Sequence, residues 1–281
     1  MQISNLHTFL AIVETGSLVR AAEQLNVTQS TVTARLQTLE QELGQPLLLR
    51  RKSGAVLTPA GERLRRYADT ITDLWQQARQ EAALPDGFRA VCNMACEDDL
   101  WPGLGRDLYH RIRSMRADLA VSVWTGSATD VARWMASGRS ELALTYRPVA
   151  DPNVDSIALP PDTLALVSTD PHSPARFDPG YILVEAGAAF ARDHATAYAD
   201  ADIARLSTGS TRLALDLMLD HGGSAYLPRR LSAPLVATGR LHKVANAPTF
   251  TRPVFALVHH AARQAWPWFD TALDTLGQQG T

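Results

Sequence analysis

The sequence contains few cysteines, few lysines and no long apolar run. Its two cysteines, Cys92 and Cys96, are too few for a disulfide scaffold, so we expect a reducing compartment. The first residues lack the basic start, apolar core and cleavage site of a secretory signal, and no stretch of about 18 apolar residues would span a bilayer. Only Lys52 and Lys243 are lysines among 27 basic residues, which we attribute to a general preference for arginine because the excess runs through the whole chain. We therefore expect a cytoplasmic protein without a membrane segment.

The remaining composition is typical of a folded protein with more than one domain. Hydrophobic residues make up 46% of the 281 and charged residues 20%, which excludes disorder as the dominant state. At roughly 150 residues per domain, the length predicts about two domains. The formal net charge of -2 hides an asymmetry, since residues 1–66 hold eight basic and five acidic residues, a net of +3, which leaves -5 for the rest. Local charge decides nucleic-acid binding, so the amino-terminal part is the candidate for a polyanionic partner.

Apolar spacing predicts three helices at the amino-terminal end, over residues 3–14, 18–25 and 29–43. Gly16 ends the first helix, Ser17 caps the second, Thr28 caps the third and Gly44 ends it. Three helices with a tight connection before the third form a helix-turn-helix arrangement. Residues 47–57 then predict a short two-stranded ribbon with a basic tip, so we expect a winged helix-turn-helix.

A longer helix is predicted over residues 59–83, with Thr58 as its cap and Pro59 in its first turn. Its apolar residues are spaced in alternating steps of three and four, which is the pattern of a coiled-coil seam. The seam residues are Leu64, Tyr67, Ile71, Leu74 and Ala78. We expect this helix to dimerise with a second copy of itself; the alternative is that it packs on its own domain.

Strands and helices alternate after Pro85-Asp86-Gly87, which marks a domain boundary. Strands are predicted over 88–94, 119–124, 141–145, 163–168, 181–184, 202–206, 223–227 and 253–258. Helices are predicted over 98–115, 128–137, 210–221 and 264–277. This alternation predicts parallel strands with helices on both faces, and the proline-rich segments near 148–161 and 171–179 are interpreted as crossings between two subdomains.

The amino-terminal motif resembles a known family. The segment AAEQLNVTQSTVTARLQTLE, residues 21–40, resembles the helix-turn-helix of LysR-type transcriptional regulators, and Pro46, Arg50 and residues 57–62 follow in the family's register. Residues 100–102, 142–144 and 222–228 resemble parts of the family's effector domain more loosely. The resemblance implies an α/β multidomain fold with a winged helix-turn-helix at 1–58, a linker helix at 59–87 and a periplasmic-binding-protein-like effector module at 88–281. Subdomain I would hold about 88–160 and 262–281, and subdomain II about 161–261.

The resemblance also implies where DNA would be contacted. A recognition helix exposes short polar side chains near its amino terminus, where they reach base edges in the major groove. Gln29, Ser30, Thr31 and Thr33 fit this description, and Arg35 lies further along the same helix. The wing residues Arg50, Arg51 and Lys52 are interpreted as phosphate contacts. The alternative for both sets is a solvated surface.

An effector is expected between the two subdomains, at strand ends and helix starts. Segments 93–98, 125–127 and 207–210 fit this position; their amides suit an anion, and Arg147 would clamp a carboxylate. Against a simple anion, Met94 and Ala95 stand where many family members have Ser or Thr, and Glu97 and Asp98 add negative charge. The candidate residues are Asn93, Met94, Cys96, Thr125, Gly126, Ser127, Arg147, Thr208 and Tyr226. Tyr226, with Trp124 and Tyr146, either lines this cleft or belongs to the core.

Three other functions are alternatives to ligand sensing. Cys92 and Cys96 would suit a redox switch, although no basic neighbour lowers the pKa of either thiol. A regulator with a non-sensing carboxy-terminal domain is a second alternative. A winged helix fused to an enzyme is a third, but the sequence has no nucleophile–base pair or metal-ligand cluster, and we expect neither cofactor nor metal. The expected partners are promoter DNA with an inverted repeat, a small-molecule effector, further copies of the chain as homodimer or tetramer, and RNA polymerase.

Overall fold

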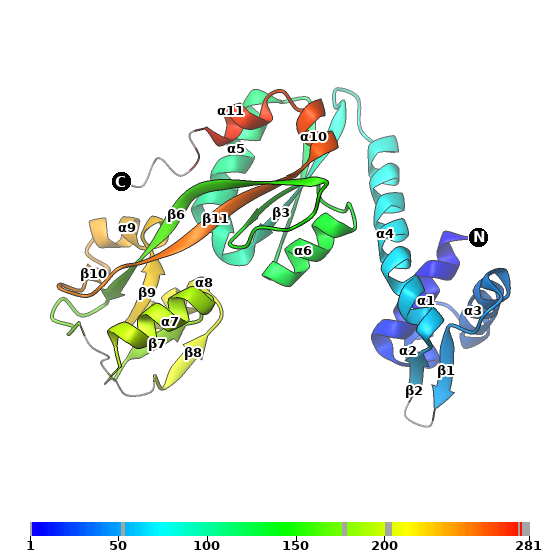
Figure 1. Cartoon of the computed structure of the whole chain (residues 1–281), viewed down its shortest axis with the longest axis horizontal. Coiled ribbons are helices and arrows are strands. Elements are labelled where there is room, and N and C mark those ends of the chain that lie inside the picture. Colours follow the sequence, from blue (N-terminus) through cyan, green and yellow to red (C-terminus); the bar gives the residue numbers. More distant parts are fainter. Residues whose placement is uncertain (1, 52–53, 176–178, 200–203, 275, 277–281) are drawn as a thin grey trace. The chain divides into compact units, whose positions relative to one another are not determined.

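The computed structural model describes residues 2–51, 54–175, 179–199, 204–274 and 276 (Figure 1). It divides into two compact units. Unit 1 holds Met1–Pro85 together with Ala136–Arg139, and unit 2 holds Asp86–Met135 and Ser140–Thr281.

Unit 1 begins with the three predicted helices, α1 (Ile3–Thr15), α2 (Leu18–Gln24) and α3 (Gln29–Leu43). The hydroxyl of Ser17 accepts a hydrogen bond from the Arg20 amide, and the hydroxyl of Thr28 accepts one from the Thr31 amide at 3.2 Å. Gly16 follows α1 with a φ of 66°, in the left-handed conformation that glycine adopts without strain. The predicted capping residues are therefore confirmed.

The wing follows as β1 (Leu48–Arg51) and β2 (Gly54–Leu57), an antiparallel pair. The wing packs on the turn before α2, because the Ala55 amide donates to the Gly16 carbonyl at 2.9 Å. A Cβ atom on Gly54 would lie 2.6 Å from that carbonyl oxygen, so only glycine fits there. Lys52 lies outside the described residues, as do the side chains of Arg50 and Arg51.

The linker helix α4 (Pro59–Ala82) begins where Thr58 accepts a hydrogen bond from the Gly61 amide at 3.0 Å. Ala68 of α4 is fully buried, and Leu64 and Ile71 pack against the same apolar core, which is built mainly from α1, α2 and α3. Two of the five predicted seam residues, Leu64 and Ile71, thus pack against the core of unit 1 itself, because they lie on the side of α4 that faces this core.

Unit 2 contains a nine-stranded sheet within its described residues. Its strands are β3 (Ala90–Glu97), β4 (Leu119–Gly126), β5 (Leu142–Thr145), β6 (Val154–Ser168), β7 (Tyr181–Val184), β8 (Leu206–Thr208), β9 (Ser224–Pro228), β10 (His242–Lys243) and β11 (Phe250–His259). The order is β4-β3-β5-β11-β6-β9-β7-β8, with β10 beside β6.

Two parallel groups in this sheet are joined by a long antiparallel pair. Strands β4, β3 and β5 are parallel to one another, as are β9, β7 and β8, while β6 and β11 run antiparallel between the groups (Figure 1). The expectation of parallel strands is thus correct for the two groups and wrong for the crossing. The expectation of a crossing near 148–161 is confirmed, because residues 154–161 belong to β6, one of the two strands that join the groups.

The pairing of the crossing strands shifts its register where prolines interrupt the hydrogen bonds. Pro160 and Pro161 lie opposite the register shift between Arg252 and Val254, and proline has no amide hydrogen for the ladder. Val258 and the three residues before it pair with β5, so the chain returns to the first strand group after Arg252 rather than at 262 as predicted. Short predicted segments could not reveal that two strands of this length span both groups.

Seven α-helices of the described part of unit 2 cover the sheet. They are α5 (Arg106–Met115), α6 (Ala128–Ala136), α7 (Ala188–Ala197), α8 (Thr211–His221), α9 (Arg229–Ala237), α10 (His260–Ala265) and α11 (Phe269–Leu273). The predicted helix 98–115 is interrupted at Pro102 and Gly103, and the predicted helix 264–277 is interrupted near Pro267. Helices α7 and α9 were not predicted. The predicted strand 202–206 falls partly outside the described residues, and β8 begins at Leu206.

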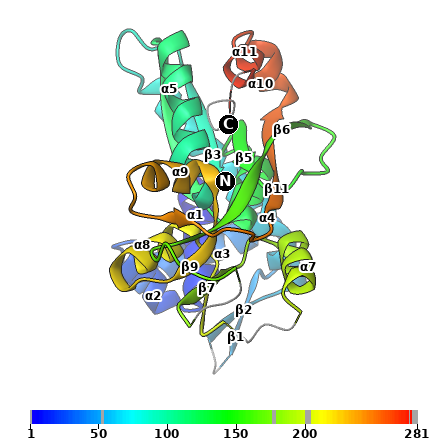
Figure 2. The same cartoon turned by 90° about the vertical axis from the view of Figure 1, so that its left-hand side faces the viewer.

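Helices pack on both faces of each strand group, as predicted. Along β7, Tyr181 packs with Phe190 of α7, whereas Ile182 packs with Leu215 of α8. Helices α7 and α8 lie on opposite sides of this strand (Figure 2). Alternate residues of β3 divide in the same way between α5 and α6. Among the described residues, no helix is both long and apolar enough to cross a membrane.

Candidate functional site

The helix α3 presents a polar face to solvent opposite its buried residues. Val32, Leu36 and Leu39 face the core, whereas Gln29 and Ser30 are exposed. The exposed side also carries Ala34, Gln37 and Thr38. Sequence reasoning missed Gln37, although it stands seven residues after Ser30 and therefore on the same side of the helix.

The other predicted DNA-contacting residues of α3, Thr31, Thr33 and Arg35, are half-buried. The hydroxyl oxygen of Thr31 lies 2.8 Å from that of Thr28, as does the hydroxyl oxygen of the exposed Ser30, so the helix cap orients both side chains. Thr33 is half-buried beside them. The guanidinium of Arg35 donates to the Thr8 hydroxyl of α1 at 3.4 Å, which directs it toward α1.

The linker helix α4 leaves an apolar face uncovered. Tyr67 is 64% exposed, and Leu74 and Trp75 are each 49% exposed; Ala78 is exposed on the same helix. Trp75 was not among the predicted seam residues, because it follows Leu74 directly and falls outside the heptad steps. Of the predicted seam, Tyr67, Leu74 and Ala78 remain available for a partner.

Unit 2 contains an open cleft with a volume of about 630 Å³. It is bounded by the end of β3, by the start of α6 and by the start of α8, three elements that lie far apart in the sequence. The lining residues are Glu97, Asp98, Asp99, Trp101, Pro102, Thr125, Gly126, Ser127, Ala128, Gly209, Ser210, Arg212 and Arg252.

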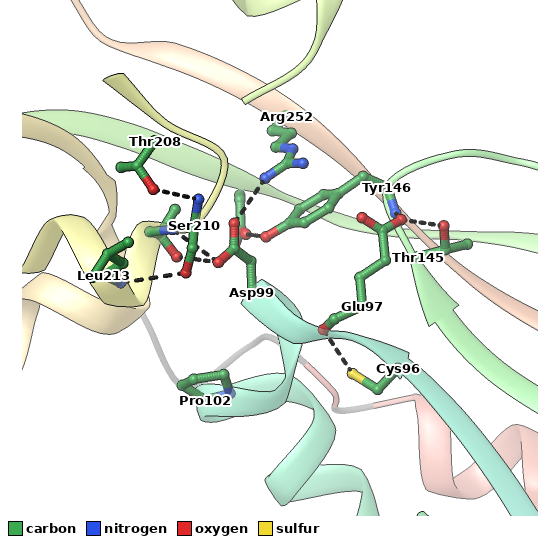
Figure 3. A network of polar contacts seen from close by, with 12 residues as sticks. Cys96, Glu97, Asp99, Pro102, Thr145, Tyr146, Thr208, Ser210, Leu213 and Arg252 are labelled. Atoms are coloured by element: carbon green, nitrogen blue, oxygen red, sulfur yellow. Dashed lines mark hydrogen bonds and ion pairs between the residues drawn. The ribbon is translucent and has the colours of Figure 1, made fainter. Parts of the chain in front are cut away.

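Asp99 connects two walls of this cleft (Figure 3). Its carboxylate accepts hydrogen bonds from the amide and the hydroxyl of Thr211, at 2.9 and 2.8 Å, at the start of α8. Arg252 places Nη1 3.6 Å from the same carboxylate and its guanidinium carbon 3.3 Å from the centre of the Tyr146 ring. Burial, followed by the nearby Asp162, raises the pKa of the Tyr146 hydroxyl.

A second arginine joins the two strand groups behind the cleft. Arg230 of α9 donates to both carboxylate oxygens of Asp162, at 2.8 and 2.9 Å, and to the Tyr146 hydroxyl at 3.0 Å. It also donates to the carbonyl oxygens of Asp99 and Pro102. Sequence reasoning found neither Arg230 nor Arg252, since no local motif marks an arginine whose partners lie far away in the chain.

Three of the nine predicted effector residues, Thr125, Gly126 and Ser127, line the cleft. Thr208 lies next to it and accepts a hydrogen bond from the Ser210 amide. The other five lie elsewhere. Asn93, Met94, Cys96 and Tyr226 are buried, because β3 and β9 run through the middle of their layers, and Arg147 is exposed outside the lining.

The geometry of the two cysteines opposes a redox switch. Both side chains are fully buried, and burial, followed by the charge of Glu141, raises the pKa of Cys92 to about 12. Burial also raises the pKa of Cys96. The two residues are four positions apart on β3, about 13 Å along a strand, whereas a disulfide needs Cα atoms within about 7 Å. No group of three or more His, Cys, Asp or Glu in the described part of the chain is arranged to hold a metal.

Comparisons with known proteins identify the family. The model "Bacterial regulatory helix-turn-helix protein, lysR family" matches residues 3–62, and the model "LysR substrate binding domain" matches residues 86–279. The chain therefore belongs to the LysR family. It is a transcriptional regulator, with a DNA-binding helix-turn-helix followed by an effector-binding domain.

Individual relatives agree with this assignment. The HTH-type transcriptional regulator HdfR of Yersinia enterocolitica is 28% identical over 268 residues, which cover 92% of this chain and 90% of that protein. The structure of ArgP from Mycobacterium tuberculosis matches with a TM-score of 0.60 and 23% identity, over 97% of this chain and 96% of that one. The structure of Vibrio fischeri DarR in complex with DNA matches with a TM-score of 0.58 and 19% identity, over 98% of this chain and 99% of that one. Such relatives are regulators rather than enzymes, and the structural matches share the fold.

Proposed function

We propose that the chain binds a partly palindromic promoter site as a dimer and that a small molecule in the unit 2 cleft modulates this binding. The observation that carries the proposal is the exposed polar face of α3 beside a wing whose sequence is basic. The candidate base contacts are Gln29, Ser30, Thr31 and Thr33, now with Gln37. Arg50, Arg51 and Lys52 remain the proposed phosphate contacts, and Arg35 is proposed to contact either a guanine or a phosphate.

The apolar face of α4 supports self-association. Tyr67, Leu74, Trp75 and Ala78 would pair with the same residues of a second copy, which would present two α3 helices to successive major grooves. We further propose that two such dimers associate into a tetramer. We also propose that the protein contacts RNA polymerase and acts in the cytoplasm. The domain limits remain 1–58, 59–87 and 88–281, with the return to subdomain I placed after Arg252.

The cleft supports the sensing part of the proposal. Its volume suits a small metabolite, and its walls come from both strand groups. A ligand that contacts both walls would favour one arrangement of the groups, and only such a difference in affinity can shift an equilibrium. We retain Thr125, Gly126, Ser127 and Thr208 as effector contacts.

Selection of genomic DNA fragments by the purified full-length protein tests the DNA-binding proposal. We expect recovery of an inverted repeat with half-sites separated by whole helical turns. Recovery of fragments without a common sequence would contradict it. On the recovered site, Arg51→Ala should weaken binding to all sequences alike and reduce the salt slope by about one unit, whereas Thr33→Ala should relax the preference at one base pair.

A further inference from the structure

The helix starts around the cleft are already occupied by the chain's own carboxylates. A helix start is a favourable place for an anionic ligand, because its amides have no partner within the helix. At α8 the carboxylate of Asp99 accepts hydrogen bonds from the Thr211 amide and hydroxyl. At α6 the carboxylate of Asp130 accepts from the Ser127 amide at 3.1 Å and from its hydroxyl at 2.6 Å. An anionic ligand at the Thr211 or Ser127 amide would have to displace the internal carboxylate bound there.

The basic side chains of the lining are also paired. Arg252 forms an ion pair with Asp99 and lies over the face of the Tyr146 ring, and its Nη1 is buried without a hydrogen-bond partner among the described residues. Arg212 pairs with Asp216 at 3.1 Å. Neither arginine is thus left as a free positive charge for a carboxylate ligand.

Glu97, in contrast to these paired side chains, has a carboxylate oxygen without a partner among the described residues. The residue is only 7% exposed, and one carboxylate oxygen accepts from the Thr145 hydroxyl at 2.5 Å and from the Tyr146 amide at 2.8 Å. Within the part of the chain that the structure describes, its other oxygen has no hydrogen-bond partner and the carboxylate has no ion pair. Glu97 lines the cleft and is fixed by these two bonds (Figure 3).

A buried carboxylate without a countercharge is unfavourable unless a cation or several donors approach it. Asp98, an exposed neighbour in the same lining, adds a second negative charge without an ion pair among the described residues. Charge-assisted hydrogen bonds to a carboxylate are roughly twice as strong as neutral ones. The free oxygen of Glu97 is therefore an acceptor in the lining that no group of the described chain uses.

We propose that the cleft selects a small organic cation, whose ammonium or guanidinium group donates to the carboxylate of Glu97. This inference rests on the proposed sensing function of the cleft. It replaces the expectation that the helix starts would bind a carboxylate. Asp99 keeps its bonds to Thr211 in the complex, so the cation binds without opening the contact between the two walls.

Calorimetric titration of the full-length protein with two probes of matched length and opposite charge tests the proposal. The probes are 1,5-diaminopentane and glutarate. We expect the diamine to bind and glutarate to give no saturable heat. The variant Glu97→Gln keeps an acceptor for Thr145 and Tyr146 but removes the charge, and it should weaken diamine binding about tenfold or more.

Two further variants serve as controls. Asp98→Asn changes an exposed side chain and should weaken diamine binding several-fold, which keeps the test valid even if Glu97→Gln does not fold. Asp270→Asn removes an exposed carboxylate of α11 outside the lining and should leave diamine binding unchanged.

Three results would overturn the inference: saturable binding of glutarate to the unmodified protein, diamine affinity that is equal in Glu97→Gln and in Asp270→Asn, or binding of neither probe. The proposed function fails separately, because it is judged by the selected DNA. A protein that selects an inverted repeat and binds glutarate would be a sensor whose ligand class was wrongly inferred.

Discussion

Replacing Leu74 with alanine should weaken self-association of the full-length chain about 30-fold. Leu74 is 49% exposed on α4 in the single chain. Burying a whole leucine side chain contributes about 2 kcal/mol, so covering the exposed half contributes about 1 kcal/mol per copy and about 2 kcal/mol per dimer. Because 1.4 kcal/mol corresponds to a factor of ten, the dimer dissociation constant rises about 30-fold.

The chain contains a closely matched control for this change. Leu213 on α8 is also a helical leucine with 49% exposure, so Leu213→Ala removes the same atoms from an equally exposed position. Sedimentation equilibrium of both variants without DNA measures the two dissociation constants. We expect the dimer dissociation constant of Leu213→Ala to stay within about twofold of that of the unmodified protein, since surface that remains exposed in the dimer contributes little to association. Equal effects of the two substitutions would refute the assignment of the α4 face to the dimer.

Three further predictions concern stability and chemistry. Thr28→Ala removes the cap of α3 and should lower the free energy of unfolding by about 1 kcal/mol in urea titrations; no change would contradict the capping role. Arg230→Met leaves the buried carboxylate of Asp162 without its ion pair and should lower the free energy of unfolding by about 3–5 kcal/mol. Arg212→Met breaks an exposed ion pair and should lower it by less than about 1 kcal/mol. Similar urea midpoints for the two variants would contradict this difference. Because burial raises the pKa of Cys92 to about 12 and also raises that of Cys96, both thiols are protonated at neutral pH. A disulfide reagent should therefore label the native protein only at its opening rate, and immediate labelling would contradict the burial of the thiols.

Unit 1 could be predicted closely because its signals are local. Ser17, Thr28 and Thr58 each stand directly before a helix, and capping depends only on residues within one turn. The apolar stripe of α3 repeats at the helical period, so its buried residues and its exposed face could be assigned from spacing. The linker helix was harder, because a heptad pattern does not say which side of a helix its own domain covers. Leu64 and Ile71 face the core, and Trp75 faces solvent.

Unit 2 was less predictable because its decisive contacts join distant parts of the chain. The antiparallel pair β6 and β11 links residues about a hundred positions apart, and the register shift between Arg252 and Val254 appears only when both strands are seen together. The cleft was predicted at strand ends and helix starts, and Ser127 at the start of α6 does line it. The same reasoning could not reveal that Asp99 fills the start of α8, since Thr211 is 112 residues further along.

These contacts suggest how unit 2 would respond to a ligand. Asp99 and Arg230 both connect the two strand groups, so contacts within the chain itself hold the described arrangement. A ligand bound at Glu97 that also contacts the wall at the start of α8 would favour this arrangement over others.

Competition binding on a promoter site recovered by selection tests the central claim most directly. The full-length protein would be titrated with the intact inverted repeat and with the same site in which one half is scrambled, at one salt concentration. A dimer that reads both halves through α3 should bind the intact site at least about a hundredfold more tightly, because the second contact is intramolecular. Equal affinity for the two DNAs would contradict a regulator that reads a palindromic site with paired recognition helices.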